Sequence, residues 1–221
     1  MNRLIIFDLD GTLLDTIDDL AAACNHALEN CGCPTRDRNE YYRLVGRGID
    51  NLFRGALPEG MKTDEMVQKM RSFFLPYYNA HGCDLTRPYE GIIEMLEKLS
   101  AAGMKFAVAS NKYQAGTEAL IKRFFGGFSF VSILGQREGK PIKPDPQIVM
   151  EAMEAVPGIC KSEVVYCGDS DVDMQTGNNA GVRTIGVTWG FRTREELLRH
   201  EPWLLAERPS EIFEALTQDT K

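Results

Sequence analysis

Residues 3–13 read RLIIFDLDGTL, an apolar run that ends abruptly in an acidic turn containing a glycine. A short run rich in Leu, Ile and Phe is typical of a strand that is buried on both faces of a sheet. Asp8 and Asp10 follow directly after it, with Gly11 and Thr12. The sequence therefore predicts a first strand over residues 3–7 that delivers two carboxylates to one edge of a sheet.

The rest of the chain repeats this pattern. Similar apolar runs occur at residues 104–109, 128–134, 163–167 and 183–188. Helical spacing lies between them, most clearly at Ile92, Met95, Leu96 and Leu99, and further helices are expected over 114–125 and 145–155. Strands that alternate with helices build parallel sheets, so we expect an α/β fold with a doubly wound parallel sheet.

The segment between the first strand and residue 88 is different. It carries helical patterns near 16–30, 37–55 and 63–80, with Thr16 as a candidate N-cap, and no convincing strand. The simplest architecture is a catalytic core of residues 1–14 and 88–221 with an all-helical module, residues 15–87, inserted after the first strand. Arg87 and Pro88 would form the return linker.

Composition narrows the class of protein. Of 221 residues, 43% are hydrophobic and 26% charged, and the net charge of −7 argues against nucleic acid or an anionic membrane as a partner. The N-terminal apolar run is too short for a signal peptide, so we expect a cytoplasmic protein whose six cysteines are reduced. Cys31 and Cys33 have no second pair at a metal-ligand spacing, which argues against a zinc site.

Polar residues follow several of the predicted strands. In a doubly wound sheet, ligands bind at the carboxyl ends of the strands. Asp8 and Asp10 follow the first strand, Ser110 and Asn111 the second, and Asp169, Asp171 and Asp173 the fourth, while Lys143-Pro144 precedes the fourth. These groups are therefore expected to converge on one rim of the sheet.

The expected cluster suits phosphoryl transfer. Asp8, Asp10 and Asp169 would repel one another if they lay close together, and oxygen ligands at this density suit Mg²⁺. A carboxylate beside a metal ion and a phosphate is a competent nucleophile, and Lys143 would add positive charge. Lys140 is an alternative for this lysine, but the proline that follows Lys143 favours Lys143.

Four segments carry a resemblance to a known family. DLDGTL at 8–13, Ser110-Asn111, Lys143-Pro144 and GDSDVD at 168–173 resemble, in order and spacing, the four motifs of the haloacid dehalogenase-like (HAD) superfamily. The resemblance spans the chain and implies a strand order of 3-2-1-4-5 and a helical cap over the site. It implies Asp8 as the nucleophile and a Mg²⁺ ligand, and Asp10 as the general acid/base that also offers its backbone carbonyl to the metal.

The same resemblance implies roles for the other site residues. Asp169 would be the third metal ligand, and Asp173 would support it. Thr12 and Ser110 would hydrogen-bond the phosphoryl oxygens, Asn111 belongs to the same substrate-binding group, and Lys143 would pair with the nucleophile and the phosphate. A dehalogenase has no leaving alkoxide to protonate, and that branch lacks an acid at this position. Because Asp10 is present, the sequence resembles the phosphatase and phosphomutase branches.

The helical module contains a second resemblance. LVGRGIDNLF at 44–53 is similar to the substrate-specificity segment of phosphoglycolate phosphatases. Arg47 could pair with a substrate carboxylate or second phosphate, or it could be an ordinary solvated arginine on a helix. We interpret Trp189-Gly190-Phe191, which also resembles that group, as packing, and Asp171 as a residue at a helix N-terminus.

These observations predict a Mg²⁺-dependent phosphatase that acts on a small phosphorylated metabolite, with 2-phosphoglycolate as the first candidate. A sugar phosphomutase resembling β-phosphoglucomutase would use the same Asp8 and Asp10, and inorganic pyrophosphate is a further candidate substrate. From a different class, the chain could be a phosphate-binding module without catalysis. The oligomeric state is not readable from the sequence.

Overall fold

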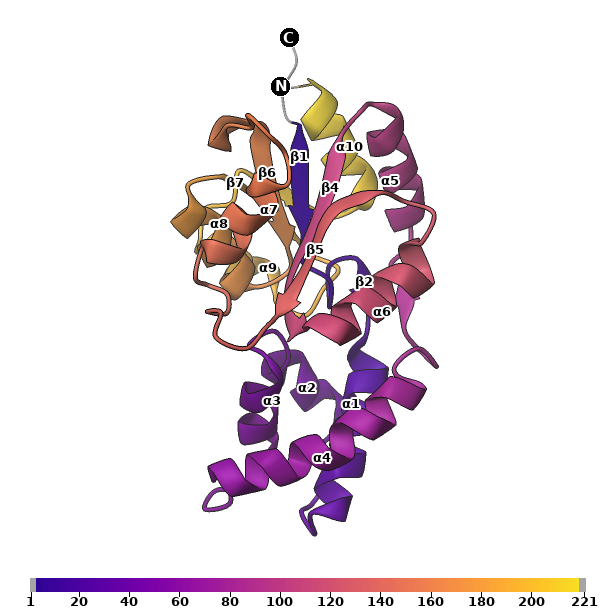
Figure 1. The fold of residues 1–221 in the computed structure, drawn as a ribbon, viewed down its shortest axis with the longest axis vertical. Helices are drawn as coiled ribbons and strands as arrows, with labels where there is room; N and C mark the ends of the chain where they lie inside the picture. The colour runs from indigo at the N-terminus through magenta and orange to yellow at the C-terminus, as the bar shows by residue number, and fades with distance from the viewer. Residues whose placement is uncertain (1–2, 219–221) are drawn as a thin grey trace.

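The computed structural model describes residues 3–218 and consists of a parallel sheet flanked by helices, with a group of helices at one end (Figure 1). Residues 1–2 and 219–221 of the expected core lie outside the described residues. In chain order the elements are β1 (Leu4–Phe7), β2 (Leu14–Asp15), α1 (Ile17–Asn30), α2 (Arg38–Leu44), α3 (Ile49–Ala56), α4 (Asp64–His81), β3 (Arg87–Pro88), α5 (Ile92–Ala101), β4 (Lys105–Tyr113), α6 (Gln114–Phe125), β5 (Phe130–Gln136), α7 (Gln147–Glu154), a 3₁₀ turn (Lys161–Glu163), β6 (Val164–Gly168), α8 (Asp171–Ala180), β7 (Arg183–Val187), α9 (Arg194–Leu198), β8 (Leu204–Ala206) and α10 (Pro209–Gln218).

The main sheet has the order β5-β4-β1-β6-β7-β8, and its neighbouring strands are parallel. This confirms the predicted fold class and the order 3-2-1-4-5 for the five expected strands. β8 extends the sheet by one strand that was not predicted, because three residues, two of them only half-buried, carry too weak a pattern. β1 lies between β4 and β6, so its carboxyl end lies in the middle of the edge at which the parallel strands end.

Both faces of the sheet are covered. Ile5 and Phe7 of β1 belong to the hydrophobic cluster formed with α5, α6 and α10, and Leu4 and Ile6 belong to the cluster formed with α7 and α8. All four side chains are fully buried. Burial on both faces explains why this strand reads as a continuous apolar run and not as an alternating one.

The four helices α1–α4 form a separate layer with a core of their own, built around the contact between α1 and α4 (Figure 1). The helix expected over 37–55 is two helices, α2 and α3. The chain breaks at Gly46 and Gly48, whose φ angles of 112° and 84° cannot continue a helix. Thr16 does stand at the N-cap of α1, but its side chain is buried and makes no capping hydrogen bond.

Two short strands join this helical layer to the sheet. β2 and β3 pair antiparallel, so the chain enters and leaves the helices at one place. The buried carboxylate of Asp19 strengthens this junction by accepting hydrogen bonds from the backbone N–H groups of Leu85 and Thr86 and from the Thr86 hydroxyl. We propose that the boundary between core and cap runs through β2 and β3, near the expected residues 14/15 and 87/88. Within residues 3–218, no helix has the length and apolar character needed to cross a membrane.

Candidate active site

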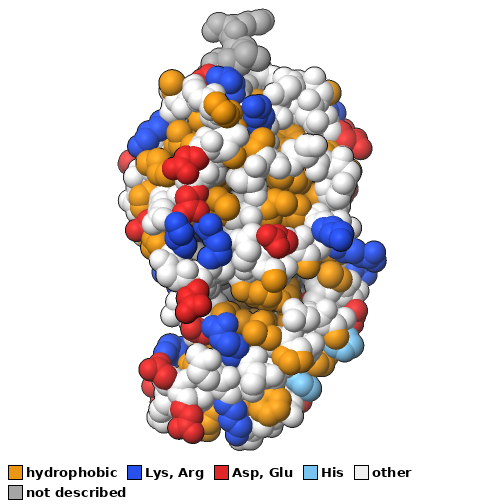
Figure 2. Space-filling model, in the orientation of Figure 1, with side chains coloured by type: hydrophobic (Ala, Val, Ile, Leu, Met, Phe, Trp, Pro, Cys, Tyr) orange, Lys and Arg blue, Asp and Glu red, His pale blue; other side chains and the backbone are white. Residues whose placement is uncertain are grey.

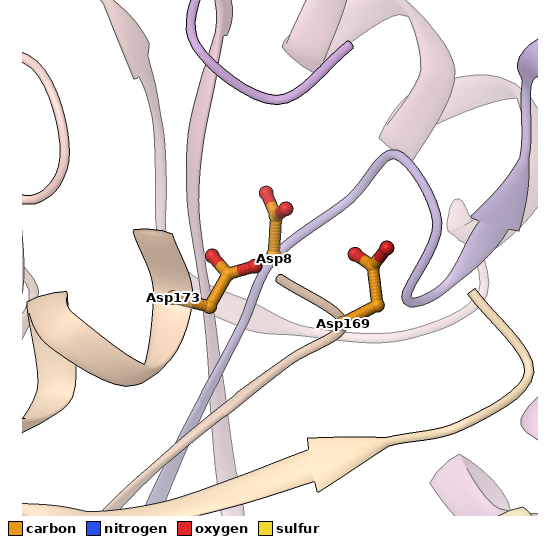
Figure 3. A group of neighbouring side chains, drawn as sticks. All are labelled: Asp8, Asp169 and Asp173. Atoms are coloured by element: carbon orange, nitrogen blue, oxygen red, sulfur yellow. The ribbon is translucent and has the colours of Figure 1, made fainter. Parts of the chain in front are cut away.

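Three aspartates meet at the carboxyl end of the central strands (Figure 3). Asp8 follows β1, Asp169 follows β6 and Asp173 lies in the first turn of α8. One carboxylate oxygen from each lies within 4.8 Å of the others, and all three residues are buried. The sequence motifs therefore converge as the topology predicts, because the carboxyl ends of adjacent parallel strands share one edge.

Two glycines make room for Asp169. A Cβ atom on Gly11, whose φ is 87°, would lie 2.4 Å from Asp169 Oδ2, and a Cβ on Gly190 would lie 2.2 Å from Asp169 Cβ. The Phe191 N–H donates to Asp169 Oδ2 at 2.7 Å. The side chains of Trp189 and Phe191 do pack in hydrophobic clusters, as interpreted from the sequence. The same segment also forms one wall around this carboxylate.

Lys143 supplies positive charge to the cluster. Its Nζ lies 2.9 Å from Asp8 Oδ1 and 2.7 Å from Asp173 Oδ1, and its side chain is 1% exposed. Lys140, the alternative lysine, lies on the surface and pairs with Glu151. Of the two lysines, the structure therefore brings Lys143 to the nucleophile candidate.

The charges in the cluster are not balanced. Burial, followed by the charge of Asp173, raises the pKa of Asp8 from 3.8 to about 7, although Lys143 acts in the opposite direction. Burial and the charges of Asp173 and Asp8 raise the pKa of Asp169 to about 8. Burial alone would lower the pKa of Lys143, but Asp173 and Asp8 outweigh it and hold its pKa well above 10.5, so the lysine stays charged. Three carboxylates thus face one ammonium group.

This imbalance fits a hard divalent cation. Asp8 Oδ1 is buried and makes no hydrogen bond of normal geometry, despite its contact with Lys143. The oxygens of Asp173 are engaged: Oδ1 contacts Lys143, and Oδ2 accepts from the backbone and hydroxyl of Ser170. Oxygen-only donors with uncompensated negative charge are the set that Mg²⁺ or a similar ion prefers. The residues present therefore fit such an ion.

Of the predicted substrate-binding residues, Thr12, Ser110 and Asn111 lie at the site, but several of their polar groups are already engaged. The Thr12 hydroxyl donates to Asp169 Oδ1 at 3.1 Å. The Asn111 amide donates to the carbonyls of Gly46 and Lys143 and accepts from the Lys143 N–H. Asn111 thus holds Lys143 in place and joins the sheet to the loop between α2 and α3. Ser110 is 2% exposed and lines the pocket described next.

A pocket of about 50 Å³ lies between the sheet edge and the helical layer. Its floor contains Asp8, Asp10, Ser110, Asn111 and Lys112, and its roof is formed by Leu20, Val45, Gly46, Gly48, Ile49, Leu52 and Phe74, with Tyr113 at the side. Figure 2 shows this face of the molecule hollowed where the helical part meets the α/β part, with hydrophobic side chains in the hollow. The roof residues carry no charged side chain, so the charged groups of the pocket lie on its floor.

Sequence reasoning missed Lys112. Its Nζ lies 3.1 and 3.2 Å from the two carboxylate oxygens of Asp10, and its side chain is 3% exposed. The available signal was its position directly after Ser110-Asn111, at the end of a strand that points at the site. We had expected β4 to end near residue 109, but it continues to Tyr113.

Arg47 lies outside the pocket lining. Its guanidinium donates to Asp171 Oδ2 and its side chain is 52% exposed. Asp171 is the first residue of α8, where a negative charge interacts favourably with the helix dipole. The buried Arg192 reaches the same helical layer by donating to the carbonyls of Tyr42 and Val45. In this arrangement both arginines join the helical layer to the α/β part of the molecule.

Comparisons with known proteins place this geometry in context. The family model described as haloacid dehalogenase-like hydrolase matches residues 5–187. A phosphoglycolate phosphatase from Vibrio parahaemolyticus is 32% identical over 97% of this chain and 96% of its own length. The pyrophosphatase PpaX from Bacillus velezensis is 31% identical over 95% of this chain and 94% of its own. The crystal structure of a predicted phosphoglycolate phosphatase from Haemophilus somnus superposes with a TM-score of 0.89, at 28% identity and 97% coverage of both chains.

Proposed function

Because the chain belongs to the haloacid dehalogenase-like hydrolase family and is a phosphatase, we propose that it hydrolyses a small phosphomonoester through an aspartyl-phosphate on Asp8. The observation that carries this proposal is the position of Asp8. Its buried carboxylate lies on the floor of the pocket, 2.9 Å from the ammonium group of Lys143. A nucleophile held beside a fixed cation meets the main requirement of phosphoryl transfer, which is positioning with charge neutralisation.

We propose Mg²⁺ as the metal, with Asp8, Asp169 and the backbone carbonyl of Asp10 as its protein ligands. The full set of hydrogen bonds to Asp173 supports a role in holding Lys143 and not in binding metal. A bound Mg²⁺ would neutralise phosphoryl oxygens and reduce the repulsion between the substrate and the carboxylates. Thr12 would then orient Asp169 through its hydrogen bond.

The chain's own residues would carry two steps. In the first, an Asp8 oxygen forms a bond to phosphorus, the bond from phosphorus to the leaving oxygen breaks, and Asp10 gives that oxygen a proton. In the second, a water oxygen bonds to phosphorus, the bond from phosphorus to Asp8 breaks, and the water proton passes to Asp10. Lys143 and Ser110 contribute donors to the phosphoryl oxygens in both steps.

We propose 2-phosphoglycolate as the substrate. Relatives that align with 97% of this chain are named phosphoglycolate phosphatases. Arg47, which the sequence suggested as a partner for the substrate carboxylate, lies outside the pocket lining. Lys112 is the residue of that lining with a cationic side chain. Inorganic pyrophosphate is a second candidate, because a relative of similar identity is named a pyrophosphatase.

The test is phosphate release from a panel of phosphoglycolate, pyrophosphate, sugar phosphates and nucleotides, with and without Mg²⁺, for the wild type and Asp8→Asn. We expect release that needs Mg²⁺, is fastest in kcat/KM for phosphoglycolate and is lost in Asp8→Asn. If phosphate release is fastest from pyrophosphate, pyrophosphate and not phosphoglycolate is the substrate, and the proposed mechanism on Asp8 still holds. Turnover by a folded Asp8→Asn protein would refute the nucleophile. Product isomers formed without phosphate release would indicate a mutase, and binding of phosphate esters without any turnover would indicate a phosphate-binding module.

A further inference from the structure

Lys112 is a buried cation for which the two-step reaction assigns no role. Its side chain is 3% exposed, and each Asp10 oxygen lies within 3.2 Å of its Nζ. Lysine is rarely buried unless it is paired, and a lysine that binds both oxygens of one carboxylate fixes the rotation of that group. Among the described residues, Lys112 is the one whose side chain forms an ion pair or hydrogen bond with the Asp10 carboxylate.

The backbone around Lys112 is built to hold this side chain. The pairing between β4 and β5 is irregular between Ala109 and Tyr113, a stretch that contains Lys112. The Lys112 N–H donates to the Ser110 hydroxyl, and the Thr117 hydroxyl donates to the Lys112 carbonyl. A Cβ on Gly135 would lie 2.6 Å from that carbonyl oxygen. These contacts hold the backbone of Lys112 at its N–H and at its carbonyl.

The helical layer covers the other side of the ion pair. Nζ of Lys112 lies 4.6 Å from the centre of the Tyr78 ring, which comes from α4 and is 4% exposed. The residues that follow Lys112 on β4 and Tyr78 on α4 are also in contact. The Tyr113 hydroxyl donates a hydrogen bond to Asn79 Oδ1 at 2.7 Å. Tyr78 thus excludes water from Lys112 only while α4 lies against the end of β4. A dry ion pair is stronger and better ordered than a hydrated one.

We propose that Lys112 is the positioning residue for Asp10, and that Tyr78 completes this arrangement when the helical layer closes over the sheet. Lys112 acts through Asp10 and does not itself exchange a proton with the substrate. The proposal rests on the proposed function, in which Asp10 protonates the leaving oxygen. It adds a physical link by which closure of the cap orders the acid/base group.

The test uses Lys112→Met, which keeps most of the length of the side chain and removes its charge. We compare kcat/KM for phenyl phosphate with that for p-nitrophenyl phosphate, whose leaving group needs little protonation. Mispositioning of Asp10 is expected to lower the phenyl phosphate value by about tenfold or more and the p-nitrophenyl value by less than about threefold. Lys105→Met, at the exposed start of the same strand, is the matched control.

A double-mutant cycle tests whether Lys112 works through Asp10. With Asp10→Asn in place, Lys112→Met is expected to change kcat/KM for phenyl phosphate by less than about twofold, against about tenfold or more when Asp10 is present. Tyr78→Leu is expected to lower kcat/KM for phenyl phosphate more than for p-nitrophenyl phosphate, but less strongly than Lys112→Met does. Tyr78→Phe keeps the ring and is expected to have a smaller effect. Thermal unfolding checks that each variant is folded.

An equal loss for both esters, or the same loss with and without Asp10, would overturn the positioning role of Lys112. A rate gain in Lys112→Met would do so as well. Equal effects of Tyr78→Leu and Tyr78→Phe would overturn the role of the ring, and these measurements keep the proposal testable if Lys112→Met fails to fold. The proposed function is tested by other results. It would be contradicted if the wild-type protein released no phosphate, or if the Asp8→Asn protein turned substrate over.

Discussion

The position of Asp169 depends on the absence of a side chain at Gly190. A Cβ there would lie 2.2 Å from Asp169 Cβ and 2.4 Å from the Gly11 carbonyl oxygen, so Gly190→Ala must displace one of them. We expect a loss of about 100-fold in kcat, because displacements near 1 Å in an active site have effects of that size. Gly127→Ala is the control, since a Cβ at Gly127 meets nothing within 4 Å. Wild-type kinetics in Gly190→Ala would contradict this account of the site.

At the same scale, the sequence indicated which carboxylates meet but not what each one touches. Asp8, Asp169 and Lys143 could be placed together because they stand at the ends of strands or beside them. The roles of Asn111 and Lys112 could not be predicted, because they depend on contacts with Gly46 and Asp10, which lie more than 60 residues away in the sequence. No local pattern encodes such pairs.

At the scale of elements, one ion-pair network fixes the loop that leads to Lys143. Hydrogen bonds from Lys140, and next from Arg137, lower the pKa of Glu151 on α7 from 4.5 to about 2. Its folded-state pKa lies below its unfolded one, so Glu151 contributes stability above about pH 4.5 and loses it as the pH falls toward 2.

Glu151→Gln is therefore expected to lower the free energy of unfolding at pH 7, with the difference from wild type narrowing between pH 5 and pH 3. Urea unfolding at several pH values measures this, and Glu97→Gln on the exposed face of α5 is the control. A difference that stays constant with pH would show that Glu151 acts by packing and not by charge.

Elements with strong periodicity were predictable, and irregular ones were not. The apolar stripe on α5 and the apolar run of β1 both correspond to buried faces in the structure. The break between α2 and α3 was missed, although Gly46 and Gly48 marked it, because apolar spacing continues on both sides. β2 and β3 have two residues each and acquire their form only by pairing with each other.

At the scale of the whole molecule, sheet and helical layer each have their own core, and polar contacts such as Arg192 with the Val45 carbonyl join them. Separate cores are consistent with a cap that opens to admit water and substrate and closes for chemistry. The sequence predicted both parts. It could not predict how they are joined, because single hydrogen bonds between distant loops leave no periodic signal.

Metal binding should stabilise the whole chain. At a free Mg²⁺ concentration of about 100 times Kd, binding to the folded state alone contributes about 2.7 kcal/mol. For a chain of 221 residues this corresponds to a rise of about 5–10 °C in Tm. Thermal unfolding with and without Mg²⁺ measures the rise, which Asp169→Asn should lose. An equal rise in both proteins would place the ion elsewhere.

The central claim is that Asp8 becomes phosphorylated during turnover. The most direct measurement is an acid quench of the working enzyme with Mg²⁺ and phosphoglycolate, or the best substrate found, followed by peptide mass spectrometry. We predict one phosphoryl group on the peptide that contains Asp8, formed and lost at rates that match turnover, and none in Asp8→Asn. Full turnover with no phosphorylated peptide at any time, or with the phosphoryl group on another residue, would contradict the account.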